Sequence, residues 1–239
     1  MQETHLATPE QCGDATEWLE KKGWRGLFAP AQRQESGKTS GGVAICVRHK
    51  ADVGVTLPHL SSDHPHRILA VKLAVSGLPE TLRVCVYMEV GVGLNRLSRT
   101  LLATAAAWQE ETRLPILMGG DFNVKPKTLQ CTDFLVRAGM TLLAPSQATY
   151  RTAKSANVID YFVASGSIAE QVATCTTLRD FPSRPHRPVK IALVVHGLCK
   201  VPILESPTKL PLQRPFGPAP EALRWAKLEA LTAEAHEYI

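Results

Sequence analysis

The first 197 residues are dominated by short runs of aliphatic and β-branched residues, each bounded by glycine, proline or polar clusters. These runs cover residues 41–48, 67–75, 81–88, 114–120, 157–165 and 187–197. Such runs predict β-strands. Some follow one another at hairpin-like spacing, and others are separated by helical patterns. This mixture predicts a layered α/β fold with mixed sheets.

Three segments have helical patterns. The clearest is 95–113, where Leu97, Leu101, Ala105 and Trp108 recur on one face. Residues 8–22 predict another helix, with Trp18 and Leu19 facing inward. A third helix is expected at about 127–138.

The composition indicates a globular chain of one sizeable domain with a tail. Of the 239 residues, 44% are hydrophobic, and no apolar stretch is long enough to span a membrane. The N-terminus has neither a basic region nor an apolar core of a secretory signal, so an intracellular protein of the nucleus or cytoplasm is expected. The six cysteines form no CxxC pair and are expected to be reduced, buried thiols.

The composition of the sequence changes after Gly197, where residues 201–220 become rich in proline. We therefore assign 1–198 to the main domain and 199–239 to a proline-rich linker followed by an amphipathic helix. The tail carries five basic and five acidic residues, so the net charge of +5 belongs to the main domain. A mildly basic domain suits a polyanionic partner without demanding one. The oligomeric state is not predicted.

Asp121 and Asn123 follow the apolar run that ends at Gly119–Gly120. In a continuing strand, residues two apart face the same side. The two side chains could then point together into a cleft, where a carboxylate holds a metal or a water. The alternative is a simple turn, because Gly-Gly-Asp-x-Asn is also good loop chemistry.

Other strand ends carry similar polar side chains. Glu3 precedes the first helix, Tyr87 ends its strand, and His186 precedes the last strand. Asp160 lies inside an apolar run, where a carboxylate is costly unless it is paired. Each residue alone has an ordinary structural explanation, such as a cap, a core tyrosine or a loop histidine.

The order of these residues resembles the endonuclease/exonuclease/phosphatase superfamily, which includes apurinic endonucleases and the endonuclease domains of non-LTR retrotransposons. The resemblance covers roughly residues 2–197 and rests on the segments QETH, SGGVAICVR, VCVY, PILMGGDFN, IDYFVAS and HRPV, in the order of the family. It implies a four-layer α/β sandwich of two mixed β-sheets flanked by helices.

The resemblance also implies a role for each matching residue. Glu3 would bind a catalytic Mg²⁺ or Mn²⁺ ion, and Asp121 would orient or deprotonate the attacking water. Asn123 would contact the scissile phosphate, and Tyr87 would hydrogen-bond the phosphate or the leaving group. His186 would face the phosphate, with Asp160 paired to its imidazole.

Three departures from the family pattern affect the site. The usual first strand, which ends in an active-site asparagine, has no counterpart before the QETH segment. Arg184-Pro185-His186 stands in place of Ser-Asp-His, so an acidic residue is replaced by proline. Tyr87 is followed by Met88 rather than by a Pro-Asn-like turn. Ser62-Asp63-His64 mimics the lost motif, but it is expected to be a polar loop between strands, far from His186.

The leading hypothesis is a metal-dependent phosphodiester hydrolase acting on nucleic acid, with DNA preferred to RNA. Because of the departures, weak or absent cleavage is expected from this chain. A phosphatase of small phosphoesters is the alternative within the superfamily. The alternative of another class is a non-catalytic remnant of such a domain, as in a decayed retroelement; an in-frame upstream strand ending in asparagine would argue against it.

Overall fold

The structure is a computed structural model that describes residues 1–50, 53–178, 181 and 185–194. The chain divides into two units, Met1–Leu198 and Cys199–Ile239. All described residues belong to the first unit. The expected linker and terminal helix at 199–239, together with Arg184, Cys199 and the end of the strand at 187–197, lie outside the described residues.

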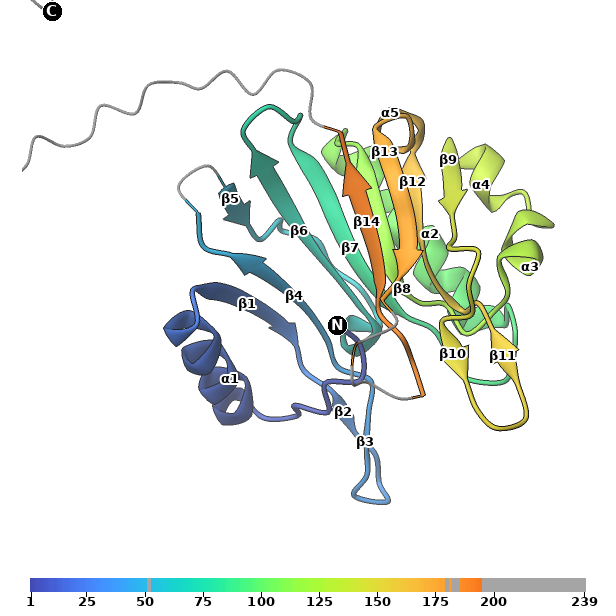
Figure 1. Cartoon of the computed structure of the whole chain (residues 1–239). Helices are drawn as coiled ribbons and strands as arrows, with labels where there is room; N and C mark the ends of the chain where they lie inside the picture. The colour runs from blue at the N-terminus through green and yellow to red at the C-terminus, as the bar shows by residue number, and fades with distance from the viewer. Residues whose placement is uncertain (51–52, 179–180, 182–184, 195–239) are drawn as a thin grey trace, which may run out of the picture. The chain divides into compact units, whose positions relative to one another are not determined.

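A six-stranded mixed sheet forms the centre of the domain (Figure 1). Its strands, in spatial order, are β5 (Val53–Thr56), β6 (Ile68–Val75), β7 (Thr81–Tyr87), β8 (Ile116–Asp121), β12 (Asp160–Ser165) and β9 (Met140–Leu143). Neighbours are antiparallel except for β7 and β8. Parallel strands need a crossover connection, and α2 (Arg96–Thr112) provides it. The predicted mixed sheet is confirmed.

Helix α2 covers one face of this sheet and contributes to the main hydrophobic core. It begins at Asn95, whose side chain accepts a hydrogen bond from the Ser98 N–H at 2.8 Å. Leu101, Ala105 and Trp108 are buried against the sheet, as the sequence predicts. Each fully buried side chain of this size contributes roughly 1.5–3 kcal/mol by leaving water.

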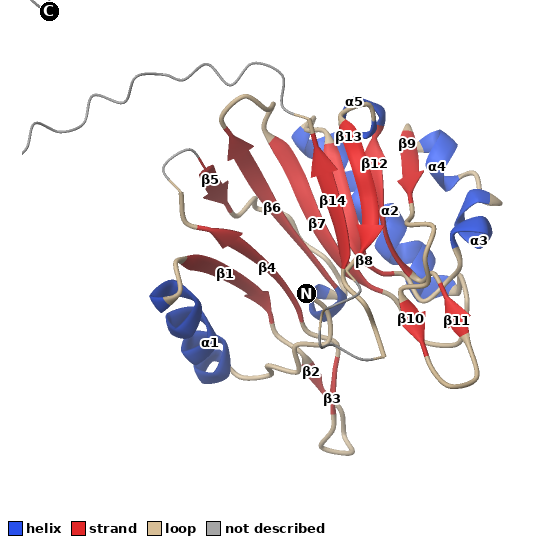
Figure 2. Cartoon of the chain, in the orientation of Figure 1, coloured by secondary structure: helices blue, strands red, loops and turns tan. Residues whose placement is uncertain are grey.

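Strands on the other face of the sheet form two separate antiparallel pairs (Figure 2). One pair is β1 (Trp24–Ala29) with β4 (Val43–Arg48), and helix α1 (Pro9–Lys21) packs against β1. The other pair is β13 (Val172–Thr177) with β14 (Val189–Leu193). Helices, strand pairs, central sheet and helices form the expected four layers. The second layer differs from the expected mixed sheet, because within the described residues its two pairs are not hydrogen-bonded to each other.

A groove of about 980 Å³ separates the two pairs. The N-terminal residues lie along it and pair with the edge of β4: the Met1 carbonyl accepts from the Ala44 N–H at 2.9 Å, and Gln2 forms a bridge with Val43. Floor residues include Arg83 and Cys85 of β7.

The remaining elements are short. They are β2 (Gln32–Arg33), β3 (Thr39–Ser40), η1 (Pro65–Arg67), α3 (Pro126–Gln130), α4 (Phe134–Arg137), β10 (Tyr150–Arg151), β11 (Ala156–Asn157) and α5 (Gly166–Ala169). The single helix expected at 127–138 is wrong, because Cys131, Thr132 and Asp133 separate α3 from α4. The inward placement of Trp18 is also wrong, since its exposed fraction is 61%. Leu19 instead faces β1, near Gly26.

Five cysteines lie in the described part of the chain. All five are free thiols, as expected, but the expected burial holds only for Cys85: Cys131 is exposed, and Cys12, Cys46 and Cys175 are partly buried. None of the described helices is long and apolar enough to cross a membrane.

Candidate active site

Three neighbouring strands bring polar side chains into one row. Tyr87 of β7 is the register partner of Asp121 of β8, and Asp121 is the register partner of Asp160 of β12. Register partners on adjacent strands point to the same face of a sheet. The row therefore projects from one edge of the sheet toward the second layer, where Tyr87 packs with Ala29 and Val43.

The Gly119–Gly120 pair makes this edge of the sheet possible. A Cβ on Gly120 would collide with the backbone carbonyl of Val86 on the neighbouring strand. A Cβ on Gly119 would collide with the ring of Phe162. Glycine is thus required where β8 approaches both neighbours closely.

His186 lies between the two carboxylates. Its Nδ1 is 3.0 and 3.1 Å from the two carboxylate oxygens of Asp160, and its Nε2 is 3.9 Å from Asp121 Oδ2. A proton on Nδ1 donates to Asp160, which leaves Nε2 directed toward Asp121. The predicted Asp160–His186 contact is confirmed. The ring of Tyr150 packs edge-on against His186, with ring centroids 4.9 Å apart.

The surroundings raise the pKa values of Asp121 and His186. Burial raises the pKa of Asp121 to about 7, and the charge of Asp160 adds to this effect. The charge of His186 and the N–H of Asn123 act in the opposite direction. The hydrogen bond to Asp160 raises the pKa of His186, against the effect of burial. Near neutral pH this site can therefore either hold or release a proton, as acid–base chemistry requires.

Glu3 and Tyr87 form a second pair beside these three residues. The Tyr87 hydroxyl donates to Glu3 Oε1 at 2.5 Å. Burial, followed by this hydrogen bond, raises the pKa of Tyr87, so the phenol stays protonated. The negative charge of Glu3 also raises the pKa of both Asp121 and His186, which places it in the same electrostatic environment. Glu3 adopts a φ of 51°, a left-handed backbone conformation.

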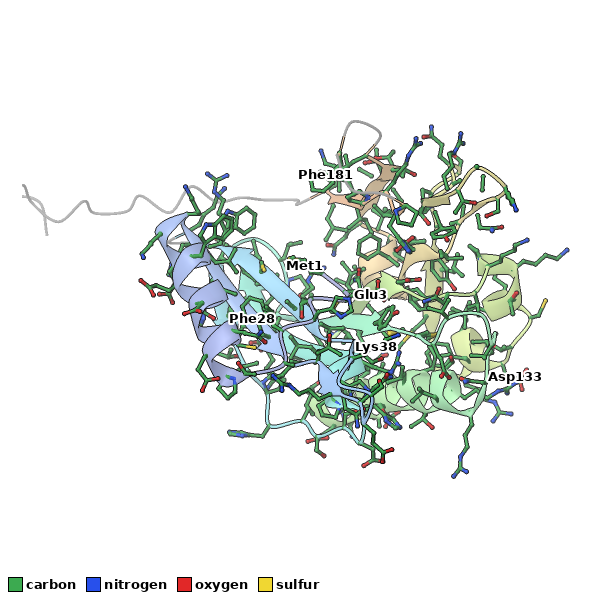
Figure 3. All side chains as sticks on the ribbon, turned by 90° about the horizontal axis from the view of Figure 1, so that it is seen from below. Met1, Glu3, Phe28, Lys38, Asp133 and Phe181 are labelled. Carbon is green, nitrogen blue, oxygen red and sulfur yellow. The ribbon has the colours of Figure 1, made fainter. Side chains whose placement is uncertain are left out.

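Glu3, Asp121, Asp160 and His186 all line the groove between the two strand pairs. Figure 3 shows Glu3 beside Met1 between the side of the domain formed by α1 and β1 and the remaining strands. The sequence predicts that Asn123 converges on the same cleft as these four residues. The prediction is confirmed for the four, whereas Asn123 is not among the residues that line the groove. Their assigned roles remain predictions.

Asn123 is arranged differently from the expectation. Strand β8 ends at Asp121, and Asn123 follows in a left-handed conformation with a φ of 51°. Its N–H donates to Asp121 Oδ1 at 2.9 Å, and its side-chain Nδ2 donates to the Met88 carbonyl at 3.0 Å. The segment is thus a turn as well as part of the site. Asn123 orients the Asp121 carboxylate through its backbone.

Ser62-Asp63-His64 lies in the loop before η1, as expected of a polar loop. The His64 N–H donates to Ser62 Oγ at 3.0 Å, and its ring contacts His66. These residues do not belong to the Asp121–Asp160–His186 cluster.

Sequence reasoning missed two residues that contact the site. Arg67 lies over the Tyr87 ring, with its Cζ 5.2 Å from the centroid, and Tyr150 packs on His186. Arg67 is the first residue of the strand predicted at 67–75 and follows a polar segment, which gives no signal of a site. Tyr150 belongs to a two-residue strand, β10, which is too short to show the alternation of apolar and polar residues that reveals a strand.

The residues present fit a divalent cation. Asp121, Asp160 and His186 each offer a ligand atom within 4.8 Å of the others, and Glu3 adds a carboxylate beside them. Carboxylate oxygens are the ligands that Mg²⁺ and Mn²⁺ prefer. Burial and the Asp160 charge disfavour the ionised form of Asp121, and a bound cation would relieve both effects.

A model of the Endonuclease/Exonuclease/phosphatase family matches residues 1–184. The chain therefore belongs to this family, whose members are nucleases and phosphatases that hydrolyse phosphoester bonds. No curated protein matches the chain.

Solved structures share the fold at low sequence identity. The endonuclease domain of TRAS1, a telomere-specific non-LTR retrotransposon, is 16% identical, with a TM-score of 0.57 over 73% of this chain and 80% of that chain. The 3′ phosphatase NExo from Neisseria, bound to a product DNA hairpin, is 22% identical, with a TM-score of 0.57 over 81% and 87%. An AP endonuclease from Archaeoglobus fulgidus is 14% identical, with a TM-score of 0.57 over 81% and 87%.

Proposed function

We propose that this protein is a Mg²⁺- or Mn²⁺-dependent phosphodiester hydrolase acting on nucleic acid, with DNA preferred to RNA. The observation that carries the proposal is the position of His186 between Asp160 at 3.0 Å and Asp121 at 3.9 Å. A fixed imidazole next to a carboxylate of pKa about 7 provides both a cation for the phosphate and a base for water.

Each residue then has a defined task. Asp121 orients the attacking water and takes its proton. Asp160 holds the His186 ring with Nδ1–H toward itself and favours the cationic ring, whose Nε2–H donates to a phosphate oxygen. The Tyr87 hydroxyl, which donates to Glu3 Oε1 in this structure, would donate to the phosphate or the leaving group once Glu3 holds the metal ion. Glu3 would hold the metal ion, which neutralises charge on the phosphate oxygens when bound.

The surroundings of the site suit a polyanion. Hairpin β2–β3 carries exposed Arg33 and Lys38, and hairpin β10–β11 carries exposed Arg151 and Lys154. Both hairpins adjoin the site, since Ser40 contacts Arg67 and Tyr150 contacts His186. Both also protrude at the same end of the domain (Figure 1). Basic side chains on either side of the reacting groups would bind the phosphates that flank the scissile bond.

Two observations favour the second candidate, a binding domain without turnover. Pro185 occupies the position at which the family pattern has an acidic residue, and the groove beside Glu3 leaves the edge of β4 only partly paired. A loosely held Glu3 would misplace a metal ion, and a displacement of about 1 Å can reduce a rate roughly a hundredfold.

A nicking assay separates the two candidates. The substrates are supercoiled plasmid, an oligonucleotide duplex with one abasic site, the matching RNA, and p-nitrophenyl phosphate as a small phosphoester. We expect slow Mg²⁺-dependent cleavage of the DNA substrates, lost with EDTA and in Asp121→Ala and His186→Ala. His64→Ala serves as the matched control and should retain activity.

Binding of DNA without cleavage under any metal condition would instead establish the non-catalytic domain. Cleavage of p-nitrophenyl phosphate alone would establish a small-molecule phosphatase. EDTA-insensitive cleavage that survives His186→Ala would rule out this site as its source.

A further inference from the structure

Thr149 is a fully buried polar residue beside Asp160. It precedes β10 and has an exposed fraction of 0%. Its hydroxyl oxygen accepts hydrogen bonds from the backbone N–H groups of Ile159 and Asp160, each at 3.0 Å. One side chain therefore holds the backbone at the beginning of β12, where Asp160 starts the strand.

The backbone of Thr149 binds the second partner of the site. Its carbonyl accepts from the Arg187 N–H at 2.6 Å, directly after His186. Its own N–H donates to the Asn157 carbonyl at 3.0 Å, which anchors the residue to β11. Thr149 thus connects the segment of Asp160 with the segment of His186, although these two residues are far apart in the sequence.

The segment around His186 has few other backbone anchors. Pro185 and Pro188 flank it, and a proline has no N–H to donate. In the described part of the chain, the Pro185 carbonyl accepts from the Arg151 N–H at 3.1 Å, and the Pro188 carbonyl accepts from the Leu178 N–H at 2.8 Å. Both of these contacts use a proline carbonyl. Among the described residues, the Arg187 N–H is the only N–H of residues 185–188 with a backbone partner, and that partner is the Thr149 carbonyl.

We propose that Thr149 is a positioning residue that sets the distance and orientation between Asp160 and His186. Its consequence for catalysis rests on the proposed function, whereas its effect on the Asp160–His186 hydrogen bond does not. Without the hydroxyl, two buried N–H groups lose their acceptor, and the start of β12 is free to shift relative to Arg187. A shift that lengthens the 3.0 Å contact at Nδ1 by about half an ångström takes it out of hydrogen-bond range.

The test compares three substitutions at position 149 with a matched control. Thr149→Val keeps the shape and removes the acceptor, Thr149→Ser keeps the hydroxyl, and Thr149→Cys offers a weaker acceptor. Thr81→Val is the control, because Thr81 is also buried and hydrogen-bonded, to the Leu73 carbonyl, but lies at the opposite end of β7 from Tyr87.

The first readout requires no catalysis. The Nδ1 proton of His186, held by Asp160, should give a low-field NMR signal that is assigned by its loss in His186→Gln. We expect this signal to disappear in Thr149→Val, to weaken in Thr149→Cys, and to persist in Thr149→Ser and Thr81→Val. If Thr149→Val does not fold, the Cys and Ser variants decide: an undiminished signal in Thr149→Cys overturns the proposal.

The second readout is the nicking rate. Thr149→Val should lower kcat roughly 10- to 100-fold with little change in KM, and Thr149→Ser should stay within about threefold of the unaltered protein. A folded Thr149→Val that keeps both the signal and kcat would refute the positioning role. An equal loss in Thr81→Val would also refute it, by showing a general effect on stability. A protein that never cleaves DNA, yet shows the expected pattern of NMR signals, would refute the proposed function and support the positioning role.

Discussion

Asp121 and Asp160 face each other directly across the antiparallel pair β8–β12. Like charges directly opposite each other destabilise a sheet, and the Asp160 charge is, after burial, the main cause of the raised pKa of Asp121. The folded protein thus contains a repulsion that the unfolded chain lacks. The charge of His186 offsets part of this repulsion. The part that is not offset should make the stability of the protein depend on pH.

The first prediction concerns stability and pH in the metal-free protein. The folded pKa of Asp121, about 7, lies above its unfolded value of 3.8, so the folded state binds more protons between these values and stability falls as pH rises from 4 to 7. Asp121→Asn removes this dependence. The variant should be about as stable as the unaltered protein near pH 4 and more stable by roughly 1–4 kcal/mol above pH 7.

Urea unfolding in EDTA at a series of pH values measures this difference. Asp133→Asn is the control, because that carboxylate is exposed and paired with Arg137, and it should change stability by less than about 0.5 kcal/mol. If the difference in free energy of unfolding between Asp121→Asn and the unaltered protein does not change with pH, the pKa of Asp121 is not raised by its surroundings and the prediction is wrong.

The second prediction tests the partner of His186. Asp160→Asn removes the charge that holds the imidazole in its cationic form, so we expect the nicking rate to fall roughly 10²- to 10⁴-fold. The pKa of His186 should fall as well, because the Asp160 hydrogen bond is the main cause that raises it. As pH is raised, any remaining activity should therefore be lost at a lower pH than in the unaltered protein, because the cationic ring loses its proton earlier. A double variant with His186→Ala should be no slower than His186→Ala alone.

The third prediction concerns Arg83 on the floor of the groove. Its Nε is buried without a hydrogen-bond partner, and burial lowers the pKa of its guanidinium to about 10. No carboxylate of the described residues forms an ion pair with it. Arg83 is only partly buried. Replacing its side chain by an apolar one of similar length removes the cost of taking the charge partly out of water, so Arg83→Met should raise the free energy of unfolding by about 1 kcal/mol.

Arg137→Met provides the comparison for this measurement. Arg137 is exposed and ion-paired with Asp133 at 3.2 Å, and its replacement should lie within about 0.5 kcal/mol of the unaltered protein. A loss of stability in Arg83→Met would mean that the guanidinium has a partner that matters for folding.

The fourth prediction contrasts two glycines. Gly120→Ala places a Cβ against the Val86 carbonyl, which cannot move without breaking the β7–β8 pairing, so it should destabilise the protein by at least about 3 kcal/mol. Gly13 lies inside α1 with nothing within 4 Å of a Cβ. Gly13→Ala should therefore stabilise by roughly 0.5–1 kcal/mol. Thermal unfolding of both variants measures the contrast, and equal effects would contradict the close approach at Gly120.

The central sheet and the need of Asp160 for a partner could be predicted from local signals, whereas the choice of His186 as that partner came from the family resemblance. The apolar runs that became β6, β7 and β8 are long enough to reveal a strand, and a carboxylate inside such a run requires a partner. Asp121 was predicted for the same reason. Its pKa of about 7 was not, because that value depends on the strand that happens to lie opposite.

The features that were missed depend on contacts distant in sequence or on very short elements. Thr149 looks like any loop threonine until Asp160 and Arg187 are placed around it. The inward placement of Trp18 failed because Leu19 takes the side of α1 that faces β1. Of the two alternatives left open for Asn123, the turn is the one found, because its N–H donates to the Asp121 carboxylate where the strand ends.

The order in which the ribosome makes this chain gives the site a further property. Glu3 is synthesised well before His186, which lies just before β14, the last strand of the described residues. Hairpins such as β6–β7 can form while the chain is still growing, because their partners are neighbours in sequence. Glu3 must wait for β7, and Asp160 must wait for His186. A nascent chain therefore cannot bring Glu3, Tyr87, Asp121, Asp160 and His186 together until residues 1–194 have been synthesised. A formed site is then present only in a fully folded domain.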